Sequence, residues 1–85
     1  MNAGSFLQHT ARVVAHRRDE YGEPEDLFEQ VAKRWSLTLG SPVSPEHVAL
    51  CLIDLKLARL AGNPGHLDSI VDVAGYAACL HEVSQ

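Results

Sequence analysis

The stretch SPEHVALCLIDLKLARLAG, residues 44–62, decides the fold of this chain. It opens with Ser44 and Pro45, a pair that is typical of a helix N-terminus, and it closes on Gly62, a residue that commonly ends a helix. Between these limits almost every residue is apolar, without the alternation that a half-buried strand shows. We therefore predict a helix here that is buried on most of its sides.

Three further segments with helical spacing lie between clusters of Gly and Pro. The pattern predicts helices over residues 5–21, from Pro24 to just before Gly40, and over residues 67–83. The last of these is again apolar on nearly every side, whereas the first two are amphipathic. Since a chain of 85 residues holds a single core, we expect one all-α domain spanning residues 1–85.

The chain has more apolar helix surface than its own helices can cover, which predicts that copies of the chain associate. Two helices that are apolar on nearly every side need more partners than two amphipathic helices supply. A chain of this size also rarely gains more than a few kcal/mol from its own core. We therefore predict a four-helix bundle that is completed by homo-oligomerisation.

Composition excludes several classes of protein. A net charge of −4 argues against unspecific binding to nucleic acid or to an anionic membrane. The longest apolar run, residues 48–53, is too short to span a bilayer, and the first residues lack a signal-peptide pattern. Cys51 and Cys79 stand in apolar stretches outside zinc or disulfide spacing, so we expect buried, reduced thiols. These features predict a cytoplasmic protein with no membrane or direct nucleic-acid partner.

Carboxylates interrupt the apolar segments. Asp54 lies in the middle of the third segment, and Asp68 and Asp72 lie four residues apart on one face of the fourth. Three acids on neighbouring helices suggest a shared cation, and carboxylate ligands suit Mg²⁺ or Mn²⁺. Glu25 and Glu29 share a face of the second segment and add to the set. Without a metal ion, such a pocket would hold like charges together.

Most of these acids also have a structural interpretation. Asp68 stands near a helix start, where a carboxylate caps the helix or favours its dipole. Asp54 can pair with an arginine of another helix, and Glu25 belongs to a first turn that solvent can reach. Asp72 is harder to explain, because an unpaired carboxylate in an apolar stretch costs several kcal/mol. The five histidines form no metal-binding set and are expected at the surface or at helix caps.

Three blocks of the sequence resemble a known family. The blocks are YGEPEDLFEQVAKRW at 21–35, SPEHVAL with DLKLARL within 44–60, and DSIVDVAGYA at 68–77. In this order they resemble small phage-encoded proteins related to MazG, within the all-α nucleoside triphosphate pyrophosphohydrolases. Members of this superfamily are helical bundles that form dimers or tetramers. They hold Mg²⁺ with acids from an EExxE helix and a following ExxD helix.

The resemblance implies a set of site residues. The string DSIVD, residues 68–72, is similar to the ExxD motif, although Ser69 stands where the motif has Glu. The EExxE motif is matched either by Asp54 on the third segment or by EDLFE at 25–29. The implied metal ligands are Glu25, Glu29, Asp54, Asp68 and Asp72, and the implied catalytic residues are Glu29, Asp54 and Asp72.

Five further residues are candidates for binding the substrate. Lys56 and Arg59 could contact phosphate oxygens, as a point charge and as a fork of donors respectively. Tyr21, Trp35 or Tyr76 could stack on a base, although a residue of this kind more often serves only in packing.

The resemblance, together with the carboxylates that could share a cation, implies a divalent-metal-dependent pyrophosphohydrolase. It would convert a (deoxy)nucleoside triphosphate, such as the purine nucleotide dGTP, to the monophosphate and pyrophosphate, in the host cytoplasm if phage-encoded. A metal ion held by carboxylates lowers the pKa of bound water, so the reaction needs no nucleophilic side chain. The alternative is a non-catalytic helical module, for nucleotide sensing or protein interaction, whose first motif is degenerate.

Overall fold

The computed structural model describes all 85 residues, and every regular element in it is a helix. The four helices are α1 (Ala3–Tyr21), α2 (Pro24–Leu39), α3 (Pro45–Gly62) and α4 (Leu67–Val83). This confirms the all-α class and the four predicted segments. Helix α1 begins earlier than expected because the side chain of Asn2 accepts a hydrogen bond of 2.9 Å from the Ser5 amide and so caps the helix.

Local signals set the other helix boundaries. The hydroxyl of Ser44 accepts a hydrogen bond of 3.2 Å from the His47 amide, as its position before Pro45 predicts. Gly40 follows α2 with a φ of 67°, in the left-handed region that favours glycine. The ring of His66 caps α4, which confirms a capping role for this histidine.

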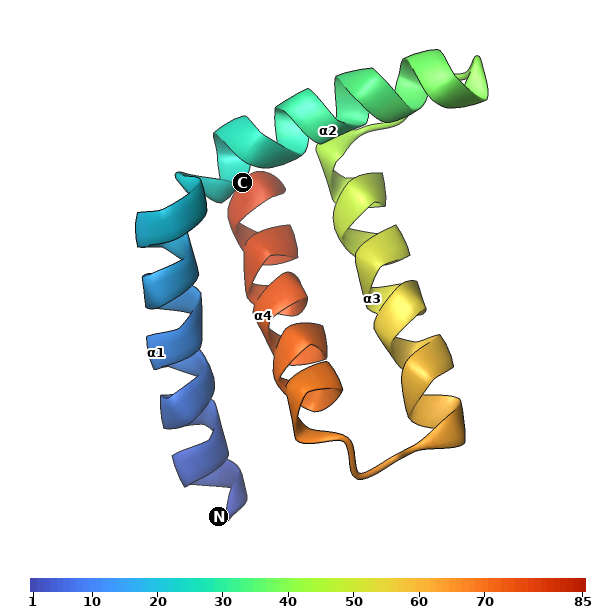
Figure 1. Ribbon diagram of the computed structural model, residues 1–85. Coiled ribbons are helices and arrows are strands. Elements are labelled where there is room, and N and C mark those ends of the chain that lie inside the picture. Colours follow the sequence, from blue (N-terminus) through green and yellow to red (C-terminus); the bar gives the residue numbers. More distant parts are fainter.

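The helices form an open layer with one helix across its end. Helices α1, α4 and α3 lie side by side with α4 in the middle, and α2 crosses one end of the layer (Figure 1). Helix α4 contacts each of the other three. The molecule measures 42 × 30 × 21 Å, so it is flat. No helix combines the length and the hydropathy that crossing a membrane requires.

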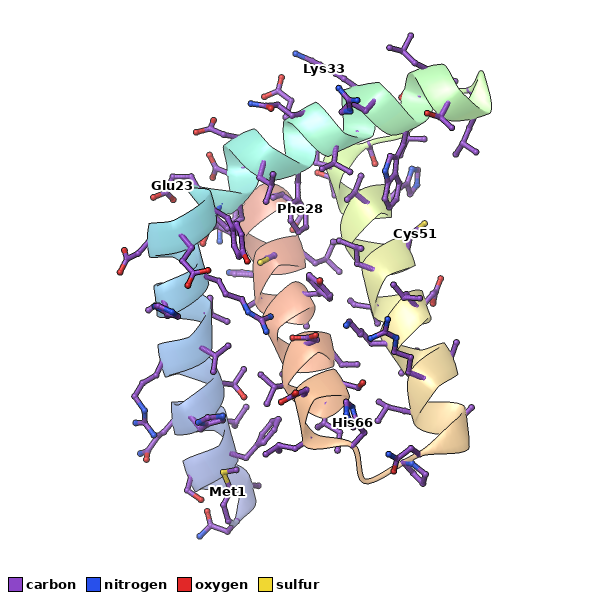
Figure 2. All side chains as sticks on the ribbon, viewed as in Figure 1. Met1, Glu23, Phe28, Lys33, Cys51 and His66 are labelled. Carbon is purple, nitrogen blue, oxygen red and sulfur yellow. The ribbon has the colours of Figure 1, made fainter.

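The core is small and lies where α2 crosses α3. It consists of Phe28, Ala32, Val48 and Ala49, and Trp35 packs against it. Figure 2 shows Phe28 on the side of α2 that faces α3 and α4. Only ten of the 85 residues are buried. A single chain therefore leaves much of its apolar surface uncovered.

Helix α3 departs most from its expected burial. Leu50, Leu55 and Leu57 are each about half exposed, although the sequence predicted a helix buried on most sides. Cys51 is exposed as well, so the prediction of a buried thiol is wrong for this residue in one chain. The reason is geometric, because α3 has α4 and α2 on one side and no neighbour on the other.

Candidate functional site

Asp72 of α4 lies between two cations from two other helices. The Nη1 atom of Arg17 on α1 lies 2.6 Å from Oδ1 of Asp72, and the Nζ atom of Lys56 on α3 lies 2.9 Å from Oδ2. The side chains of Asp72 and Lys56 are 10% and 13% exposed, whereas that of Arg17 is 45% exposed. The Asp72 carboxylate therefore ties α1 and α3 to α4 through a largely shielded ion-pair triad.

The two cations keep this carboxylate ionised. Burial raises the pKa of Asp72, but hydrogen bonds from Lys56 and Arg17 and the charges of both residues outweigh it, so the pKa lies below its usual value. The hydrogen bond between Arg17 and Asp72 also raises the pKa of Arg17. The neighbours of Asp72 are thus positive, whereas the sequence predicted a crowd of other acids.

Stability should depend on pH through this group. A carboxyl group with a lowered pKa in the folded chain stabilises the protein above its unfolded pKa, which is near 3.8 for Asp72, and this contribution disappears as pH falls through the folded pKa. We expect the free energy of unfolding to fall on acidification from about pH 5 to pH 3. We expect a plot of the unfolding free energy against pH, measured by urea unfolding across this range, to have a shallower slope for Asp72→Asn than for the native protein. The control is Asp19→Asn, which removes an exposed carboxylate of α1, and a native-like slope in Asp72→Asn would contradict the prediction.

Arg17 was missed by the sequence analysis. On a helical projection it falls on the same face of α1 as Phe6, Thr10 and Val13. A charged residue on an apolar stripe needs a partner from the core, and this signal could have identified Arg17. Lys56 could not have been placed in the same way, because α3 is apolar on nearly every side and its periodicity indicates no inner face.

A cavity of about 450 Å³ adjoins Asp72 and is lined by all four helices. Nine of its 15 lining residues are hydrophobic, among them Phe28 of the core. Asp72 is the only acidic residue in the lining, which also includes Arg17 and Arg18. The guanidinium group of Arg18 is paired with Glu82, and its Nε atom lies 3.7 Å from Oε2 of Glu23. The full lining is Val14, Arg17, Arg18, Tyr21, Gly22, Pro24, Leu27, Phe28, Val31, Val48, Leu52, Asp72, Gly75, Tyr76 and Cys79.

Two of the five predicted substrate-binding residues line this cavity, namely Tyr21 and Tyr76. The other three do not. Lys56 is directed to Asp72, Trp35 packs against the core, and Arg59 is exposed in the last turn of α3.

The predicted metal ligands do not come together within one chain. Glu25, Glu29, Asp54 and Asp68 are all exposed, and none of them lines the cavity. The Oε1 atom of Glu29 lies 3.5 Å from the Nζ atom of Lys33, one turn further along the same helix. No group of three or more His, Cys, Asp or Glu residues is placed to hold a metal ion. Because Asp72 is already bonded to two cations, the carboxylates of one chain do not fit Mg²⁺ or Mn²⁺.

The fold and this site define a small all-helical domain built around a shielded ion-pair triad. Residues 5–84 match the family described as a domain of unknown function, DUF6378, and the chain belongs to that family. No solved structure matches the chain significantly.

Two curated relatives are phage proteins. The Gene 55 protein of Mycobacterium phage D29 is 35% identical over 80 residues, which cover 93% of this chain and 53% of that protein. The Gene 55 protein of Mycobacterium phage L5 is 38% identical over 81 residues, which cover 93% of this chain and 52% of that protein. The chain thus spans about half the length of these relatives, and their source supports a bacteriophage origin.

Proposed function

We propose that this protein is a nucleotide pyrophosphohydrolase that converts a (deoxy)nucleoside triphosphate to the monophosphate and pyrophosphate. The observation that carries the proposal is the cavity that brings Tyr21 and Tyr76 together with Arg17, Arg18 and Asp72. Asp72 and Tyr76 also belong to the block at 68–77 that resembles MazG-related proteins. The phage origin of the relatives fits an enzyme that manages nucleotide pools. We further propose that its substrate is a purine nucleotide such as dGTP.

The size and lining of the cavity support a nucleotide as its ligand. A volume of about 450 Å³ falls within the usual range of small-molecule sites. Its hydrophobic walls suit the base, and the two tyrosines offer aromatic faces for stacking. Arg17 and Arg18 carry guanidinium donors that match phosphate oxygens. In the unliganded chain they are paired with Asp72 and Glu82, so a bound phosphate would have to share or replace these partners.

A requirement for Mg²⁺ or Mn²⁺ is also proposed, although the acids of one chain do not fit the ion. Mg²⁺ is usually held by one or two carboxylates together with the phosphates of the substrate, not by a cage of protein ligands. The metal requirement therefore depends on ligands that a bound triphosphate or another chain supplies.

The second candidate is a helical module that binds a nucleotide without cleaving it. The pairing of Asp72 with Arg17 and Lys56 favours this candidate, because a carboxylate held by two cations is not free to act as a base or a metal ligand. The same cavity would serve both candidates.

Product analysis separates the two candidates. The protein is incubated with a panel of ribo- and deoxyribonucleoside triphosphates, including dGTP, in the presence of Mg²⁺ or Mn²⁺. Monophosphate and pyrophosphate would support the enzyme, and nucleotide binding without turnover would support the module. Release of diphosphate and phosphate would indicate another class of phosphatase, and neither binding nor turnover would refute both candidates.

A change at Tyr76 tests the place of binding. Tyr76→Leu removes an aromatic face from the cavity and should weaken nucleotide affinity by about tenfold, since stacking of a base on an aromatic ring contributes about 1–3 kcal/mol. Tyr76→Phe keeps the ring and serves as the matched control, with near-native affinity. Calorimetric titration of the two variants measures the difference. Equal affinities for both would place the nucleotide elsewhere.

A further inference from the structure

The guanidinium group of Arg18 lies between two carboxylates at the rim of the cavity. Its Nη2 atom donates a hydrogen bond to Oε1 of Glu82, in the last turn of α4, and its Nε atom lies 3.7 Å from Oε2 of Glu23, the residue before α2. Arg18 lines the cavity, and so do the residues on either side of Glu23, whereas Glu23 and Glu82 themselves do not. The two carboxylates therefore stand just outside the cavity, where the end of α4 meets the junction of α1 and α2 (Figure 1).

Arg18 is only partly satisfied by these two partners. Its Nε atom is shielded from solvent and makes no hydrogen bond, because 3.7 Å is too long for one. Nε and Nη2 lie on the same edge of the planar guanidinium group, and this edge matches two oxygens of a single phosphate. Since a shielded donor without an acceptor costs free energy, a phosphate that bonded to both atoms would satisfy Arg18 better than the two carboxylates do.

Arg18 can exchange its partners at lower cost than Arg17. The side chains of Glu82 and Glu23 are 31% and 58% exposed, so water can solvate both carboxylates once they are released. Arg17 is bonded to Asp72, which is 10% exposed, and release of Arg17 would leave a largely buried carboxylate with one cation fewer. A phosphate that enters the site is therefore expected to replace the partners of Arg18 and to leave the ion-pair triad intact.

The same two carboxylates oppose an incoming anion. The hydrogen bond to Glu82 and the charge of Glu23 both raise the pKa of Arg18, which reflects the attraction of the two carboxylates for this cation. Two negative charges beside a single positive charge leave this part of the rim negative, and like charges repel. A phosphate must therefore displace the carboxylates before Arg18 can bind it, whereas a nucleoside, which carries no phosphate, does not take part in this competition.

We propose that Arg18 binds the phosphate of the nucleotide at the rim of the cavity, and that Glu82 and Glu23 occupy Arg18 until the phosphate displaces them. This proposal rests on the proposed function, because it takes the ligand to be a nucleotide. The base would lie inside the cavity against the hydrophobic walls, and the phosphate would lie at the junction of α1 and α2. Glu82 and Glu23 thus lower the affinity of the unliganded site for its own ligand.

Binding of a nucleotide and of its nucleoside tests the exchange of partners. The nucleotide dGMP is a product of the proposed reaction, so its binding can be measured without turnover, and deoxyguanosine is the same molecule without the phosphate. Calorimetric titration of both ligands in EDTA isolates the contribution of the phosphate. The native protein should bind dGMP more tightly than deoxyguanosine.

Two substitutions should change the affinity for dGMP in opposite directions. Glu82→Gln removes a competing charge and should tighten binding about fivefold, the scale of a partly exposed ion pair. Arg18→Lys keeps the positive charge but loses the edge with two donors, and it should weaken binding about tenfold. Neither substitution should change the affinity for deoxyguanosine. The matched control is Glu20→Gln, which removes an equal charge from the last turn of α1, where Glu20 pairs with His16, and it should bind both ligands as the native protein does.

Specific results would overturn the exchange. Weaker binding of dGMP to Glu82→Gln would show that Glu82 positions Arg18 for the phosphate instead of competing with it. Tighter binding to Glu20→Gln, by the same factor as to Glu82→Gln, would indicate a general effect of net charge. Native-like binding of dGMP to Arg18→Lys, in a protein whose circular dichroism is unchanged, would place the phosphate elsewhere.

The proposed function can fail separately from this exchange. If dGMP binds as expected but no triphosphate is cleaved, the enzyme is refuted and the exchange stands. Pyrophosphate is a probe without a base, so its binding, with the same response to Glu82→Gln and Arg18→Lys, would sustain the exchange even if no nucleotide bound. Cleavage of triphosphates with a native KM in both variants would support the enzyme and refute the exchange. Absence of binding of both dGMP and pyrophosphate, in the native protein and in Glu82→Gln, would also refute the exchange.

Discussion

Replacing Asp72 with asparagine is expected to lower the free energy of unfolding by about 3 kcal/mol, because it leaves Lys56 and Arg17 without their anion in a shielded site. Lys56 is the more costly of the two to leave unpaired, since its side chain is 13% exposed and that of Arg17 is 45% exposed. Urea unfolding at neutral pH in EDTA measures the loss, at a protein concentration that holds the oligomeric state constant.

Two comparisons isolate the ion pairs from other effects of this substitution. Asp19→Asn removes an exposed carboxylate of α1 and should change stability by less than about 0.5 kcal/mol. Lys56→Met should cost less in the Asp72→Asn background than in the native chain, because the two residues interact directly. Unchanged or higher stability of Asp72→Asn in EDTA would instead indicate a carboxylate crowded by like charges, as a metal-binding pocket requires.

Replacing Phe28 with alanine is expected to cost about 4 kcal/mol, the usual scale for deleting a buried aromatic ring. Phe28 is 5% exposed and is the largest member of a core that otherwise holds Ala32, Val48 and Ala49. A domain of 85 residues has a total stability of roughly 4–13 kcal/mol. The variant should therefore unfold at a much lower temperature, which thermal denaturation followed by circular dichroism measures.

Leu37→Ala is the matched control for this change. Leu37 lies on the same helix but is 85% exposed, so its truncation should have little effect on stability. If Phe28→Ala lost less than about 1 kcal/mol, the main core would lie elsewhere in the protein.

Phe28→Ala and Asp72→Asn should also have different effects on the cavity. Phe28 and Asp72 both line it, one as an apolar wall and the other as its only acid. A destabilised Phe28→Ala protein that still binds nucleotide at low temperature would assign Phe28 to the core alone. Loss of binding in a folded Asp72→Asn protein would assign Asp72 to the site as well as to the ion-pair triad.

The helices themselves could be predicted from the sequence because their boundaries depend on residues within a few positions. Ser44 and Pro45 start α3, and Gly40 ends α2 in a left-handed conformation, as local backbone hydrogen bonding dictates. The choice of Tyr21 and Tyr76 as candidate binding residues is consistent with the cavity, since both line it. Their role in binding a nucleotide stays a prediction.

The side of α3 that faces the core could not be predicted in this way. Since this helix is apolar on nearly every side, its periodicity indicates no inner face. The contact with α4 decides that Lys56 lies inside and reaches Asp72, while Asp54 lies outside. The acids of α3 and α4 therefore do not meet within one chain, although the sequence suggested that they would.

The sequence by itself determined the all-helical class, the four helices and all of their ends except the start of α1, because these depend on local hydrogen bonds and on the apolar pattern of each segment. The tertiary structure decided which charges pair. Arg17 and Asp72 are 55 residues apart, and their contact depends on how α1 and α4 are rotated about their own axes. Such rotations follow from the packing of all four helices together, which no single segment specifies.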